Sequence, residues 1–152
     1  MGHLAGVEQL SRRGRFSEAL QLLERSQFPP HERLEADAVR AELLERTGRY
    51  SASKALAEQV LRNPRCLPSQ RCSCLMALAY CAFEHGFIDV SMSHFQKALS
   101  AAEAAKDLRA TCICQLKVMN LLADRSGYFA VTPMLAEIRR NVTQLGDGVT
   151  AA

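Results

Sequence analysis

The chain has 152 residues, which is enough for one domain with a sizeable core, and 48% of its residues are apolar. Tryptophan is absent and aromatic residues make up only 6%, and β-branched residues do not cluster, so the composition favours helices over strands. The net charge of +3 arises from both signs mixed along the chain, which excludes a basic arm of the kind that binds nucleic acid.

Helix signals follow one another through the first half of the chain, with apolar residues at helical spacing. Gly14, the prolines at 29–30, Gly48 and Pro64 separate these helices. Pro30 suits the first turn of a helix, where its missing N–H is not needed. We therefore expect helices over residues 3–13, 16–26, 30–46 and 50–62.

The second half continues in the same way. Ser69 is a candidate N-cap for a long helix that Gly86 ends, and Asp107 can cap a later helix that ends at Gly127. We expect helices over residues 69–85, 87–104, 107–125 and 128–144. Gly146 should break the last of these, so that residues 147–152 form the start of a truncated further unit or a tail.

Four glycines closely followed by an aromatic residue mark a repeating unit. Gly14, Gly48, Gly86 and Gly127 are spaced 34, 38 and 41 residues apart. Each of them ends one predicted helix, so that every second helix of the chain ends at such a glycine. The chain must reverse there, and glycine tolerates the positive φ angle that such a turn often demands. The spacing predicts an all-α solenoid of about four antiparallel helix pairs, eight helices in one domain over 1–146. The units are roughly 1–28, 29–66, 67–105 and 106–145.

The stretch GRFSEALQLLERS at 14–26 resembles the second-helix signature of the tetratricopeptide repeat (TPR). Aligned on the four glycines, the small-residue positions of that signature are Ala19, Ser53, Ser91 and Thr132. The next apolar positions are Leu23, Ala57, Phe95 and Ala136. The match is poorest in the fourth unit, where Arg139 replaces a small residue. The resemblance implies a right-handed α-solenoid that binds proteins, in a long-helix variant similar to the repeats of large bacterial regulatory proteins.

In TPR proteins the first helices of the units form a concave inner face, and the resemblance places a candidate partner-binding set there. Its members are Arg12, Glu42, Arg46, Met76, Tyr80, Phe83, Glu84, Lys117, Leu121 and Arg125. Apolar side chains flanked by charges suit an amphipathic helix or an extended peptide. The alternative is that Met76 and Phe83 pack against a neighbouring helix. The Lys–Asn clamp with which related domains hold heat-shock proteins is missing, so we do not expect that function.

No pattern of residues indicates catalysis. The four histidines fall on separate predicted elements or their ends, and phosphate-loop, H-E-x-x-H and G-x-S-x-G motifs are missing. The six cysteines include two C-x-C pairs, whose members point in different directions on a helix, so we interpret them as buried packing residues. A redox or zinc role is the open alternative. We expect no enzyme activity, no cofactor or metal, and no small-molecule substrate.

The sequence therefore predicts a protein–protein interaction scaffold, the repeat segment of a larger regulatory or signalling protein. One alternative is self-association into a homodimer through uncapped terminal helices. Nucleic-acid binding through the arginines is less favoured, because the charges of both signs are mixed. The longest apolar run, at 74–83, is about half a membrane span, and the N-terminus lacks an apolar leader. We expect no membrane association and a cytoplasmic location.

Overall fold

The computed structural model of the chain describes the backbone of residues 4–150 and the side chains of residues 4–146. Within this part the chain is all-helical and contains no strand, which confirms the predicted fold class. The eight helices are α1 (Ala5–Arg12), α2 (Phe16–Arg25), α3 (Arg33–Arg46), α4 (Tyr50–Arg62), α5 (Pro68–Glu84), α6 (Ile88–Ala104), α7 (Leu108–Ser126) and α8 (Tyr128–Thr150).

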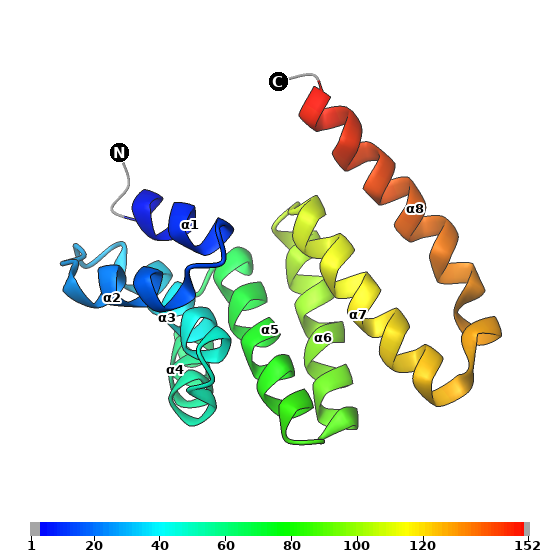
Figure 1. Ribbon diagram of the computed structural model, residues 1–152, viewed down its shortest axis with the longest axis horizontal. Coiled ribbons are helices and arrows are strands. Elements are labelled where there is room, and N and C mark those ends of the chain that lie inside the picture. Colours follow the sequence, from blue (N-terminus) through cyan, green and yellow to red (C-terminus); the bar gives the residue numbers. More distant parts are fainter. Residues whose placement is uncertain (1–3, 151–152) are drawn as a thin grey trace.

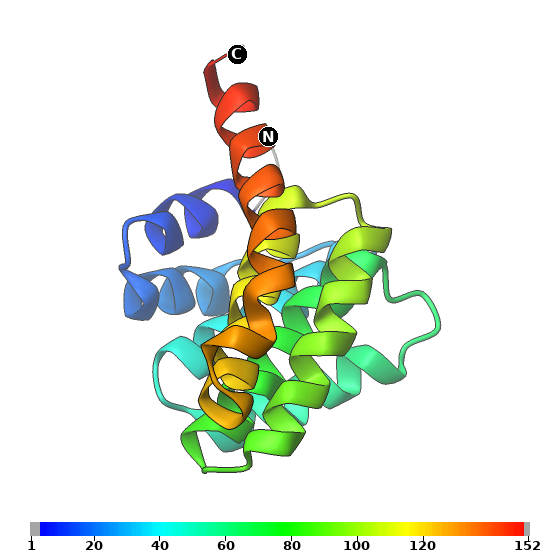
Figure 2. The same cartoon turned by 90° about the vertical axis from the view of Figure 1, so that its right-hand side faces the viewer.

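The helices form a solenoid of antiparallel pairs. Each helix packs against its neighbours in the sequence, and α3 also packs against α5 in the next pair. Figure 1 shows the resulting row, with the α1–α2 pair at one end and α8 at the other, and Figure 2 shows the same row from its α8 side. The first helices of the four pairs are α1, α3, α5 and α7, and the second helices are α2, α4, α6 and α8. No described helix is long and apolar enough to cross a membrane.

The predicted small-residue positions lie where the helices of a pair touch. Ala19, Ser53 and Ser91 are completely buried. The hydroxyl of Ser53 donates to the carbonyl oxygen of Ala41 at 2.7 Å, and that of Ser91 donates to the carbonyl oxygen of Ala79 at 2.8 Å. A buried hydroxyl needs such a partner, and a small side chain lets it reach the neighbouring backbone. One repeated hydrogen bond therefore joins α3 to α4 and α5 to α6.

The cysteines lie mainly in the core. Five of the six are buried and Cys66 is half-buried, and all are free thiols. Burial raises the pKa of the Cys74 thiol to about 12, so this side chain stays protonated and packs as a small apolar group. Among the described residues no group of three histidine, cysteine or acidic side chains is placed to hold a metal ion.

The repeated glycines form the turns between paired helices. Gly14, Gly48, Gly86 and Gly127 have φ angles of 73°, 76°, 77° and 79°, as the sequence predicted. After the first three, the next amide donates to the carbonyl oxygen five residues back, at 2.8 to 3.0 Å, which is the Schellman pattern. Lys106, between α6 and α7, forms the same pattern with a φ angle of 54° and without the freedom of glycine.

The second helix of the fourth pair packs in a different register from the predicted one. Alignment on Gly127 predicted that Thr132 and Ala136 face the first helix, but both are exposed. Val131 and Ile138 are buried instead, at 2% and 6% exposure. The turn differs here, because the amide of Gly127 donates four residues back and its ψ angle is 159°. The prediction was therefore wrong because α8 begins with a different rotation about its axis.

The predicted N-caps have different outcomes. Asp107 caps α7 as expected, and its carboxylate accepts a hydrogen bond from the amide of Ala110 at 2.9 Å. Ser69 does not cap α5, which begins one residue earlier at a proline. The side chain of Gln70 instead accepts a hydrogen bond from the amide of Leu67 at 3.0 Å, so a residue inside the first turn satisfies the helix start.

Two other helix ends also differ from the prediction. Pro30 lies in a turn, and α3 begins only at Arg33. Gly146 does not break the last helix, and α8 continues to Thr150, so the predicted break is wrong. Glycine lowers helix propensity by about 1 kcal/mol, which a helix of this length can absorb. Residues 147–150, predicted as the start of a further unit or a tail, instead continue α8, and residues 151 and 152 lie outside the described part.

The turn geometry predicts opposite effects of two substitutions. A Cβ atom added at Gly86 would meet nothing within 4 Å, so Gly86→Ala should cost only the left-handed backbone conformation, about 1 to 2 kcal/mol. Lys106→Gly relieves the same conformation and should stabilise the fold by up to about 1 kcal/mol, reduced by the greater freedom of glycine in the unfolded chain. Urea unfolding of both variants measures the effects. Changes of the same sign would contradict this account of the turns.

Candidate functional site

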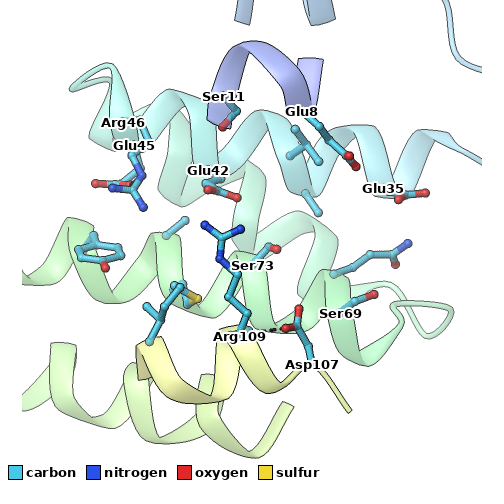
Figure 3. A pocket seen from close by; sticks show the side chains of 18 of the residues that line it. Glu8, Ser11, Glu35, Glu42, Glu45, Arg46, Ser69, Ser73, Asp107 and Arg109 are labelled. Carbon is cyan, nitrogen blue, oxygen red and sulfur yellow. Dashed lines mark hydrogen bonds and ion pairs between the residues drawn. The ribbon is translucent and has the colours of Figure 1, made fainter. Parts of the chain in front are cut away.

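The first helices together line a groove of about 540 Å³. Figure 3 shows side chains from α1, α3, α5 and the start of α7 converging on it. Of the predicted partner-binding residues, the structure places five on this groove: Arg12, Glu42, Arg46, Met76 and Tyr80. Five of the ten predicted residues therefore line the groove, and the other five do not.

The groove combines apolar side chains with short hydroxyl groups. Its apolar lining consists of Phe16, Ala38, Val39, Met76, Ala77, Ala110 and Ile113. Its serines are Ser11, Ser69 and Ser73. Small side chains leave room for the side chains of a ligand, and the hydroxyls can donate to or accept from the backbone of a bound peptide.

One end of the groove is built around Tyr80. The guanidinium carbon of Arg46 lies 5.3 Å from the centre of the Tyr80 ring and 5.6 Å from that of Phe16. The ammonium of Lys117 lies 5.1 Å from the Tyr80 ring, and Phe95 meets that ring edge-on at 5.1 Å. These cation–π and aromatic contacts connect α2, α3, α5, α6 and α7. They hold Arg46 and Tyr80 in fixed positions.

Two carboxylates of α3 lie in an unfavourable environment. Glu45 is only 9% exposed, and its Oε2 accepts no hydrogen bond; the nearest cation is Nε of Arg46 at 3.6 Å. Burial raises the pKa of Glu45 to about 6, an effect that Arg46 and Lys117 oppose and that Glu42 and Glu84 reinforce. Burial also raises the pKa of Glu42. The groove thus holds negative charge that has been largely removed from water.

Several predicted residues lie away from the groove. Leu121 is buried in the core at 6% exposure, so its predicted place on the inner surface is wrong. Arg125 forms an ion pair with Asp89 of α6 at 2.7 Å and does not line the groove, which corrects its predicted position. Phe83 is 45% exposed near the end of α5, beyond the groove lining, as is Glu84. Lys117 does not line the groove, but its ammonium contacts the ring of Tyr80, which does.

The groove also contains residues that the sequence did not point to. On α7 the prediction centred on the C-terminal half, whereas the structure uses the first turns, with Arg109, Ala110 and Ile113. The error came from aligning the fourth unit on Gly127, which lies at the far end of α7. Ala110 and Ile113 lie three residues apart, and this helical spacing is the sequence pattern that could have placed them on one face of α7.

A second hollow of about 370 Å³ lies between α4, α5 and α6. Ser51, Phe87 and His94 are among its lining residues. Burial lowers the pKa of His94, and the Nδ1 atom of this ring has no hydrogen-bond partner. Because this hollow involves the second helices, it offers positions for control substitutions that leave the groove untouched.

Comparison with protein-family models gives no match, and comparison with curated proteins gives none either. Function is therefore inferred from the groove itself.

The burial of Glu45 predicts a pH-dependent stability. Its folded-state pKa of about 6 lies above the ordinary value of 4.5, so folding favours the protonated form. Stability from this group is present below about pH 4.5 and is lost as the pH rises through about 6, by about 2 kcal/mol. As the pH rises from about 4.5 to 7.5, the free energy of unfolding of Glu45→Gln should therefore rise by about 2 kcal/mol relative to that of the wild type.

Urea unfolding at the two pH values measures this difference. Glu103→Gln, an exposed carboxylate of α6, is the matched control and should show no such change. The charged groups that influence Glu45 are Glu42 and Arg46 on α3, Glu84 on α5 and Lys117 on α7. A constant difference between wild type and Glu45→Gln across this range would show that Glu45 ionises like an exposed carboxylate.

Proposed function

We propose that this protein is a non-catalytic, TPR-like scaffold whose groove binds a peptide segment of a partner protein. The observation that carries the proposal is a groove lined by first helices from all four pairs, whose lining combines apolar, hydroxyl and charged side chains. Such a surface can take apolar side chains of a ligand while ionic contacts set its register.

The turns and helix contacts support the TPR-like assignment. Glycines with positive φ angles end three first helices with the same hydrogen bonds, and small residues five positions later are fully buried. On this basis we also propose the right-handed superhelix of that family, a cytoplasmic location and a place within a larger regulatory or signalling protein. These follow from the family resemblance, which guides function only by analogy.

The charge of the groove bears on the choice of partner class. Its acidic residues are Glu8, Glu35, Glu42, Glu45 and Asp107, and its basic residues are Arg12, Arg46 and Arg109. Nucleic acid requires a basic surface, because its phosphates must be neutralised. An excess of carboxylates therefore favours a protein ligand over nucleic acid in this groove.

A blocked groove tests the proposal. Twelve-residue peptides of random sequence, displayed on phage, are selected on the wild-type protein, and enriched peptides are measured by fluorescence polarisation. Ser73→Trp fills the groove from α5, whereas Ser51→Trp places the same side chain in the second hollow. We expect a loss of affinity of about tenfold or more in Ser73→Trp alone, because buried apolar contact dominates such binding. Equal affinities for both variants would place the binding site elsewhere.

Self-association is a second candidate function, favoured by exposed apolar residues at the start of α8 and along that helix. Tyr128 and Phe129 are 79% and 97% exposed, and Leu135 and Val142 are each 49% exposed. If these residues pair with a second copy, the protein should elute as a dimer in size exclusion with light scattering. Phe129→Ser with Leu135→Ser should then give a monomer. A wild-type monomer at high concentration would exclude this function.

A further inference from the structure

One face of α3 places a row of carboxylates along the groove. Glu35, Glu42 and Glu45 all belong to the groove lining. They follow one another at intervals of seven and three residues, which correspond to about 10 Å and about 5 Å along the helix axis. Figure 3 shows them on α3, opposite the start of α7 across the groove.

Apart from Arg109, the other charged side chains of the groove are already engaged. Arg12 pairs with Glu8 at 3.8 Å, and the carboxylate of Asp107 caps its own helix. Arg46 lies between two aromatic rings and is 3.6 Å from Glu45, too far for a hydrogen bond.

The carboxylates of α3 lack comparable partners. Among the described residues, neither Glu35 nor Glu42 takes part in a hydrogen bond or a close ion pair. Oε2 of Glu45 is buried without a hydrogen bond, on a side chain more than nine-tenths buried. A buried charge without a donor destabilises the protein until something supplies one.

We propose that the partner segment bound in this groove is basic, and that its lysine or arginine side chains pair with Glu42 and Glu45. This inference rests on the proposed function and adds the chemistry of the ligand. A cation entering the groove can donate to the carboxylate of Glu42, which forms no ion pair among the described residues, and is attracted by the buried carboxylate of Glu45 beside it. Hydrogen bonds between charged groups are stronger than those between neutral groups, and a site shielded from water strengthens them further.

The row also sets the spacing of the basic residues. The interval of about 10 Å between Glu35 and Glu42 equals about three residues of an extended chain or seven of a helix. A segment lying along α3 thus matches both carboxylates when its basic residues are three apart if extended, or seven apart if helical.

Arg109 is the cation of the groove that a basic ligand must tolerate. It extends from α7 into the space between α7 and α3 (Figure 3), and none of the ion pairs of the described residues includes it. A basic ligand is repelled by this guanidinium, whereas an acidic ligand is attracted by it. Removing its charge therefore changes the two affinities in opposite directions.

The experiment uses phage-selected peptides whose binding Ser73→Trp abolishes. Their affinities are measured for the wild type and for three isosteric or near-isosteric variants: Glu42→Gln with Glu45→Gln, Arg109→Gln, and the control Glu103→Gln. We expect the peptides to be enriched in lysine and arginine. Their affinity should fall at least about tenfold in the double variant, rise about threefold in Arg109→Gln and stay unchanged in the control.

The outcomes separate this inference from the proposed function. The inference would be overturned by selected peptides that are neutral or acidic and that bind the double variant as tightly as the wild type. If Ser73→Trp still abolishes the binding of these peptides, the groove remains a peptide site. An affinity that falls in Arg109→Gln would overturn it in the same way. If Ser73→Trp excludes no selected peptide, the proposed function fails and the inference fails with it. Circular dichroism and urea unfolding confirm that each variant is folded.

Discussion

The left-handed turn at the end of the first helix is the constraint on which the rest of this structure depends. At Gly14, Gly48 and Gly86 the same backbone geometry reverses the chain within a few residues. The rotation of the second helix is thereby fixed, so the residue five positions after the glycine always faces the first helix. Only a small side chain fits there, and Ser53 and Ser91 use the close approach to hydrogen bond to the opposite backbone.

The groove follows from this constraint, because the second helices of the first three pairs, packed in one register, leave their first helices on a common face. That face keeps charge where stability alone would remove it. Glu45 is buried beside Glu42 without a hydrogen-bond donor, while Arg46 is held by aromatic rings close to the same carboxylate. Sites adapted to binding commonly sacrifice stability in this way, since a ligand restores the missing contacts.

Part of the local chemistry was predictable from the sequence, whereas the rotation of the last two helices was not. Positive φ at the glycines and the cap at Asp107 depend on a few consecutive residues, and both were predicted correctly. Burial of Leu121 depends on how α7 crosses α5 and α6, which a repeat alignment assumes rather than derives. The error at Thr132 has the same origin, because Gly127 resembles the other glycines in sequence but forms a different turn.

A solenoid of neighbour contacts also has a consequence for how the chain unfolds. Each helix draws its stability mainly from adjacent helices, so the pairs are linked in series and the end pairs can open before the middle ones. The groove lies across this series, with lining residues from α1, α3, α5 and α7. An occupant that contacts all four helices would bridge the first and fourth pairs, which have no core cluster in common among the described residues. Binding would thus change the cooperativity of the fold, from a chain of separately opening units to one that opens as a whole.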